Sequence, residues 1–188
     1  MERAYDGRVM DPILVAQRLP QLAERAMRGA IVTLALSHEG GGRNATQRAL
    51  ITNALIRFER MVQRAAGDGI RPALLFAERD RIVNDLRTFA AGRLAARLFA
   101  VRPRDVVAVG RDAGGFDAIV RGRRGGVYGV VFRRLARDGR RLEAMRAIRA
   151  AARSYAGEDL RGVLVYDFAS GTVRTLRCGE RPVELSAA

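Results

Sequence analysis

The chain contains no lysine, no tryptophan, one histidine and one cysteine among its 188 residues. A single cysteine, Cys178, excludes an internal disulfide and is typical of a protein from a reducing compartment. No apolar stretch approaches the roughly 18 residues that a membrane-spanning helix requires, and the first residues show no basic segment followed by an apolar one. We therefore expect a cytoplasmic protein with no membrane partner.

Other absences argue against several kinds of site. The only histidine, His38, has no cysteine or second histidine near it in sequence, which argues against zinc. The glycines at 40–42 are not followed by the Gly-Lys-Ser/Thr of a phosphate-binding loop. No Gly-x-Ser-x-Gly segment supports a Ser-His-Asp hydrolase. None of these three chemistries is supported by the sequence.

The charge of the chain is strongly one-sided. All 34 basic residues are arginine against 20 acidic residues, which leaves a net charge of +14. Codon bias in a GC-rich genome accounts for the missing lysine, but it does not account for the excess of cations over acids. Because the planar guanidinium group binds phosphate through two parallel hydrogen bonds, we expect nucleic acid, DNA or RNA, as the partner. An acidic protein partner is the alternative.

The first part of the chain reads as helical, and we predict an all-helical N-terminal region over residues 1–69. Asp11 and Pro12 are typical of a helix start. The apolar segment at 30–36 fits either a buried helical turn or a short strand. A second helix is expected to begin at Asn44 or Thr46 and to end before Gly67.

The rest of the chain, residues 70–188, is predicted to form an α/β core. One helix is expected over residues 77–99, after which the apolar period changes from helical to strand-like. The expected elements that follow are strands at 105–109, 116–120 and 127–134, a helix at 139–155, and strands at 162–168 and 172–176. This order predicts an α/β domain with a helical extension.

Two of these strands form a hairpin with one carboxylate, Asp117, on its first strand. The hairpin and the elements around it resemble the core of the PD-(D/E)XK nuclease superfamily, which has the restriction-endonuclease-like fold. In that resemblance Asp117 matches the first metal-binding acid, Val131 the second acid and Arg133 the lysine. The resemblance implies a central mixed β-sheet flanked by helices, and a nucleic-acid-processing scaffold.

The two departures question the chemistry that the family carries out. Phosphodiester hydrolysis needs Mg²⁺ held by carboxylates, and Asp117 alone would be a weak ligand. Arg133 can bind phosphate but cannot act as a base, because it does not lose its proton. Glu143 on the following helix, Asp112 or Glu78 can replace the missing acid in an active, divergent nuclease that uses Mg²⁺. The missing groups favour an inactive scaffold without a cofactor. Asp117 can equally be an ordinary acid paired with a nearby arginine.

Many arginines surround the hairpin and the following helix. We expect them to cluster at one end of the hairpin and to grip a phosphate backbone without reading bases, alone or within a larger nucleic-acid-processing or defence assembly. These are Arg121, Arg123, Arg124, Arg133, Arg134, Arg137, Arg140 and Arg141. The alternative without nucleic acid is a structural subunit, whose N-terminal helices form a homo-oligomer or hold a protein partner.

Overall fold

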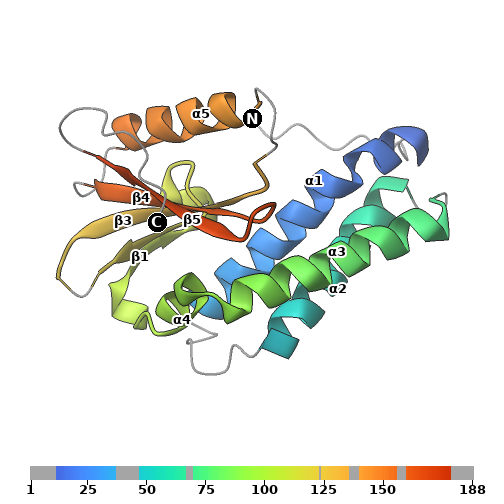
Figure 1. The fold of residues 1–188 in the computed structure, drawn as a ribbon, viewed down its shortest axis with the longest axis horizontal. Helices are drawn as coiled ribbons and strands as arrows, with labels where there is room; N and C mark the ends of the chain where they lie inside the picture. The colour runs from blue at the N-terminus through green and yellow to red at the C-terminus, as the bar shows by residue number, and fades with distance from the viewer. Residues whose placement is uncertain are drawn as a thin grey trace. The chain divides into compact units, whose positions relative to one another are not determined.

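The computed structural model describes residues 12–36, 47–66, 70–122, 124–135, 140–155 and 160–178. By its internal contacts the chain divides into two compact units, Met1–Ala100 and Val101–Ala188. The first is helical and the second is built on a β-sheet (Figure 1). This division lies two helices later than the residue 69/70 division expected from the sequence, and α3 (Pro72–Ala91) packs against the two helices that precede it.

The helical unit contains four α-helices in its described residues. The apolar segment at 30–36 is helical, since α1 continues directly into a π-helical turn at Val32–Leu36. The sequence allowed this interpretation beside a strand. The helices are α1 (Pro12–Ile31), α2 (Gln47–Ala66), α3 (Pro72–Ala91) and α4 (Arg93–Phe99).

One apolar face of each long helix forms the core of this unit. On α2, Leu50, Phe58 and Val62 lie on the buried face, at the spacing of helical turns. Arg57, on the next face of α2, donates through Nη2 to Thr33 Oγ1 at 2.8 Å and through Nε to Asn53 Oδ1 at 2.6 Å. The bond to Thr33 joins α2 to the π-helical turn, and the bond to Asn53 lies within α2.

The single helix expected over residues 77–99 is wrong in two respects. Its first turn begins earlier, at Pro72, whose ring is compatible with the start of a helix. The helix also ends at Ala91, because Gly92 takes an extended conformation with ψ 156° and its N–H donates to Phe89 O at 2.9 Å. A new helix, α4, starts after this glycine.

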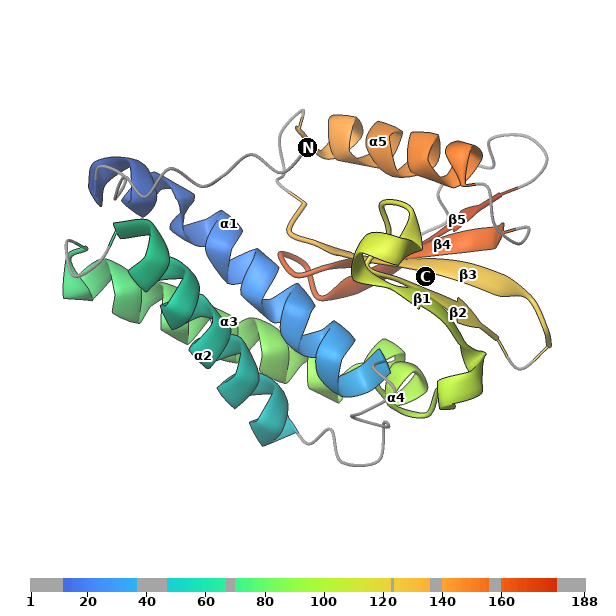
Figure 2. The same cartoon turned by 180° about the vertical axis from the view of Figure 1, so that it is seen from behind.

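The second unit confirms the α/β prediction, with an open, mixed sheet of five strands in the order β1-β2-β3-β4-β5. Strands β1, β2 and β3 form an antiparallel meander, β4 runs parallel to β3, and β5 is antiparallel to β4. A helix, α5, connects the two parallel strands (Figure 2). The elements are β1 (Val106–Val109), β2 (Ala118–Arg121), β3 (Val127–Arg133), α5 (Arg140–Ser154), β4 (Leu160–Asp167) and β5 (Thr172–Arg177).

Alternate residues of the strands build an apolar core beneath α5. Val131, Val163 and Val165 belong to one buried cluster with Met145 and Ile148 of the helix. Such alternation along a strand, facing a helix with a 3.6-residue period, is the pattern that the sequence displayed. The core thus fixes which side chains of β3 face the helix.

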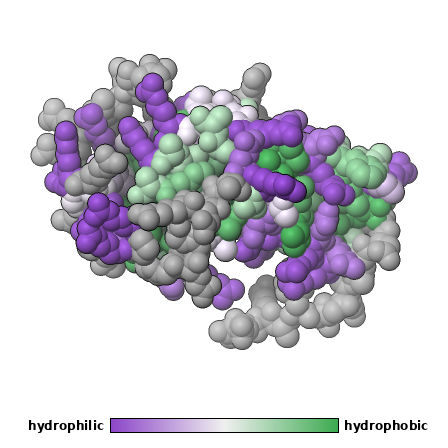
Figure 3. Space-filling model, turned by 90° about the horizontal axis from the view of Figure 1, so that it is seen from below, coloured by the Kyte–Doolittle hydropathy of each residue, from purple (hydrophilic) through white to green (hydrophobic). Residues whose placement is uncertain are grey.

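The described residues contain no helix that is both long and apolar enough to cross a membrane. On the face shown in Figure 3, hydrophilic side chains are distributed among hydrophobic ones.

Candidate functional site

Asp117 lies immediately before β2 and is held there by its backbone. Its N–H donates to Val130 O at 2.9 Å, and its carbonyl accepts from Gly110 N–H at 2.9 Å. One bond reaches β3 and the other reaches the end of β1, so the residue is tied to both neighbouring strands. The Asp117 carboxylate is therefore placed by the meander and not by a flexible loop.

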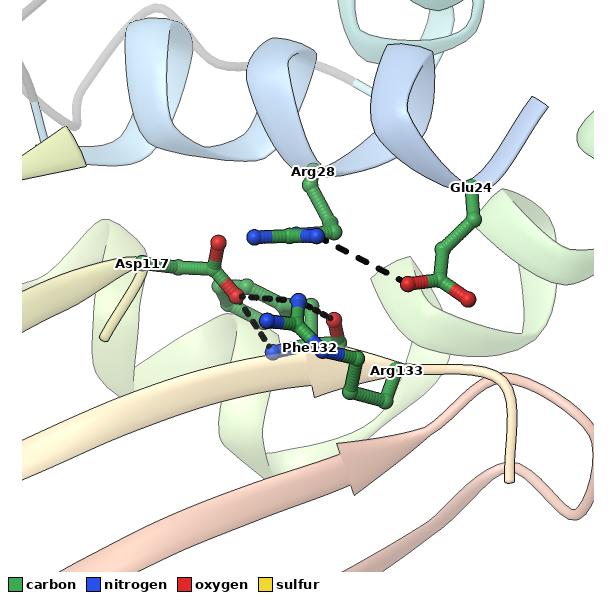
Figure 4. Close-up of polar contacts among 5 residues, drawn as sticks. All are labelled: Glu24, Arg28, Asp117, Phe132 and Arg133. Carbon is green, nitrogen blue, oxygen red and sulfur yellow. Dashed lines mark hydrogen bonds and ion pairs between the residues drawn. The ribbon is translucent and has the colours of Figure 1, made fainter. Parts of the chain in front are cut away.

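The side chain of Asp117 is bound by nitrogen donors of β3 (Figure 4). Its Oδ2 accepts from Phe132 N–H at 2.7 Å and lies 3.5 Å from Arg133 Nη1. The same Nη1 donates to Phe132 O at 2.9 Å, so the guanidinium group of Arg133 folds back over its own strand. Asp117 is buried, with 5% of its surface exposed. This is the acid–arginine pair that the sequence allowed as the ordinary interpretation of Asp117.

The position of the missing second acid is part of the core. Val131 is 1% exposed and packs in the cluster beneath α5, so a carboxylate there would need a different environment. The acids that the sequence offered as replacements lie elsewhere. Glu143 is exposed on α5, and Asp112 is exposed in the short 3-10 helix Gly110–Ala113. In the helical unit, Glu78 Oε1 accepts from Arg81 Nη1 at 2.6 Å.

The donor side chains of the described residues do not form a metal site. Within the described ranges, no group of three or more His, Cys, Asp or Glu side chains is placed to hold a metal ion. At Asp117 a cation, Arg133 Nη1, lies 3.5 Å from Oδ2 and competes with a metal for the same oxygen. The residues present therefore do not fit the Mg²⁺ site that the resemblance implies.

A second buried acid, Asp167, escaped the sequence interpretation. It ends β4 beside Arg133 of β3, and its Oδ1 accepts from Leu135 N–H at 3.0 Å and from Ala169 N–H at 2.9 Å. Its Oδ2 accepts from Ser170 Oγ at 2.8 Å. An aspartate at the start of a Phe-Ala-Ser-Gly turn is a recognisable signal for side-chain to backbone bonds of this kind. Asp167 therefore anchors the chain after β3 to the turn between β4 and β5.

The predicted arginine cluster is wrong as a single group, because β3 separates its members. Arg121 ends β2 and Arg124 lies in the following turn, whereas Arg133 and Arg134 lie at the far end of β3. Six residue steps of about 3.3 Å separate the ends of this strand by roughly 20 Å. Of the remaining predicted members, Arg123 and Arg137 lie outside the described residues. Arg140 and Arg141 begin α5, but their side chains also lie outside the described part.

Comparison of the chain with family models, curated proteins and solved structures finds no significant match. The family resemblance therefore stays a proposal, carried by the order of elements and by the residues of β2 and β3.

Proposed function

We propose that this chain is a nuclease-like protein of the PD-(D/E)XK type that binds a nucleic-acid backbone and has lost the catalytic set. The position of Asp117 before β2, next to the end of β3, supports the assignment. The helix α5 and the parallel pairing of β3 with β4 follow in the expected order. The restriction-endonuclease-like fold is part of this proposal.

One observation carries the loss of chemistry. The carboxylate of Asp117 is bound by Arg133 and by the N–H of Phe132, where a metal-dependent nuclease needs a second acid and a free lysine. An arginine in this place neutralises the carboxylate and keeps its own proton, so it supplies neither a metal ligand nor a base. The excess of arginine over acid still favours a polyanionic partner.

The proposal is tested with the full chain and labelled DNA and RNA, in the presence of Mg²⁺ or Mn²⁺. We expect no cleavage, and binding whose affinity falls steeply with salt. Asp117→Asn is compared with Asp80→Asn, which changes an exposed acid of the helical unit by the same atoms. Cleavage that only the Asp117 variant abolishes would establish the active nuclease instead. No binding at low salt would leave the structural subunit, which acts through its helices.

A further inference from the structure

The strand register brings arginines together that are far apart in the sequence. One end of the sheet contains the start of β1, the end of β2, the starts of β3 and β4, and the end of β5. The register places them there, because Val106 pairs with Val120, Arg121 with Val127, and Gly162 with Arg177. Val127 in turn pairs with Leu160. The arginines there, which we call the basic end, are Arg102, Arg104, Arg121, Arg124, Arg161 and Arg177.

Acids are distributed differently between the two ends. Among the described residues, the basic end contains one acid, Asp105, next to the start of β1. The other end of the strands contains Arg111, Arg133 and Arg134, but Asp112, Asp117 and Asp167 accompany them. The charge there is balanced, and two of these acids are already bound by hydrogen bonds within the protein. Within the described ranges, the excess of positive over negative charge in the sheet unit therefore lies at the basic end.

Three arginines of the basic end present their guanidinium groups at the surface. The side chains of Arg124, Arg161 and Arg177 are exposed, and within the described part of the chain none of these three makes an ion pair. The chain also makes room for one of them, because a Cβ on Gly126 would lie 2.6 Å from Arg161 Cδ. Gly126 thus lets the Arg161 side chain lie across the turn between β2 and β3.

The aromatic residues favour one class of nucleic acid. In the described residues of the sheet unit no aromatic side chain is exposed, and the ring of Tyr128, the aromatic residue closest to this turn, packs against Gly122. Proteins that bind single strands combine a basic groove with aromatic rings on which bases stack. A surface of arginines without such rings suits contact with phosphates alone.

We propose that the basic end binds the phosphate backbone of double-stranded nucleic acid, on the opposite end of the strands from Asp117. This inference rests on the proposed function, since it states where the nucleic acid is bound and that it is double-stranded. Neighbouring strands are about 4.8 Å apart, so arginines on β2, β4 and β5 spread over roughly 14 Å of the sheet end. That width suits several phosphates of one duplex and not a single small anion.

The test measures the affinity of the full chain for a labelled 20-base-pair duplex, and for the corresponding single strand, over a series of salt concentrations. The double variant Arg161→Gln/Arg177→Gln is compared with Arg146→Gln/Arg149→Gln, which removes the same charge from exposed positions of α5. Each lost phosphate contact reduces the slope of log affinity against log salt by about 0.9. We expect the basic-end variant to lose about 1.8 of the slope and the α5 variant to keep the wild-type slope.

Equal losses in the two variants, or tighter binding of the single strand than of the duplex, would overturn this inference while leaving the proposed function intact. If the wild-type chain binds neither nucleic acid at low salt, the proposed function itself fails. Circular dichroism and urea unfolding of both variants establish that they are folded before their slopes are compared.

Discussion

Arg133 Nη1 bridges Asp117 Oδ2, at 3.5 Å, and the carbonyl oxygen of Phe132, at 2.9 Å. The arginine thereby links the carboxylate before β2 to the backbone of β3, next to the bond from Phe132 N–H to the same carboxylate. The residue that the proposed nuclease resemblance places at the lysine position here links two neighbouring strands.

The first prediction concerns this link. Asp117→Asn keeps the shape of the side chain but removes the charge that Arg133 and Phe132 N–H share. We expect the free energy of unfolding in urea to fall by about 1–3 kcal/mol, the range for a charged hydrogen-bond acceptor in a buried site. Asp112→Asn is the control and should stay within about 0.5 kcal/mol, because Asp112 is exposed. Equal effects in the two variants would contradict a stabilising role of the link.

Asp167 is expected to contribute more to stability than a single hydrogen bond does. Asp167→Ala leaves the N–H groups of Leu135 and Ala169 without their acceptor, so we expect a loss of about 3 kcal/mol in the free energy of unfolding. Ser170→Ala removes one of the bonds to this carboxylate and should cost about 1 kcal/mol. A larger loss for the Ser170 variant would show that the turn, and not Asp167, holds the strand ends.

Glu78 is expected to reduce the stability of the helical unit. Its side chain is buried on α3, and its Oε2 has no hydrogen-bond partner among the described residues. Glu78→Met should raise the free energy of unfolding by about 1 kcal/mol, because Arg81 is largely exposed and returns to solvent. Chemical denaturation of this variant is compared with that of Glu59→Met, whose half-exposed pair with Arg79 contributes little. A destabilised Glu78→Met variant would mean that a partner of Glu78 offsets the free-energy cost of burying its carboxylate.

Gly162 permits the close approach of β4 and β5. A Cβ at this position would lie 2.6 Å from the carbonyl oxygen of Leu176, and a backbone atom cannot move aside as a side chain does. We therefore expect Gly162→Ala to lower the free energy of unfolding by about 3 kcal/mol, at the upper end for overpacking. Gly110→Ala meets no atom within 4 Å and should cost about 1 kcal/mol, for its left-handed φ of 61° alone. Equal losses would mean that the sheet adapts to the added methyl group.

The thiol of Cys178 should be less reactive in the folded chain than in the unfolded one. Burial raises the pKa of Cys178 above its ordinary value, because the thiolate loses its hydration. The alkylation rate with iodoacetamide should therefore reach half its maximum at a higher pH in the native protein than in guanidinium chloride. Since the protonated thiol is favoured in the fold, its contribution to stability is present below the unfolded pKa of about 8.5. It is lost as the pH rises through the folded pKa. Cys178→Ser should lack this loss, and identical alkylation profiles would contradict the prediction.

The elements of the sheet unit were predictable because each has its own period in the sequence. The alternation in β3 and β4, and the helical stripe of α5, are local patterns that the core beneath α5 reinforces. The break at Gly92 was not predictable in the same way, since an isolated glycine inside an apolar helical pattern is usually tolerated. The packing of α3 on α1 and α2 is a tertiary contact, which local sequence patterns do not reveal.

The site was predictable only in part. Asp117 and its pairing with an arginine followed from neighbouring strands, so the sequence was sufficient to suggest them. The grouping of Arg161 and Arg177 with Arg124 depends on the register of β3 against β4, whose paired residues are more than 30 apart in the chain, and local patterns do not fix that register. The hydrogen bonds of Asp167 could have been predicted from the turn that follows it, because the residues of that turn are recognisable in the sequence.

The open sheet also leaves two strand edges that bear on association between copies of the chain. Arginines at two positions of β5 place charge along one edge, and charge of one sign discourages pairing with another strand. Strand β1 has only Val-Val-Ala-Val, with Val107 37% exposed, and no charge to protect it. Its pairing with β2 is interrupted between Val106 and Ala108, and it spans four residues. Its shortness and irregularity are therefore what guard this side of the sheet against edge-to-edge aggregation.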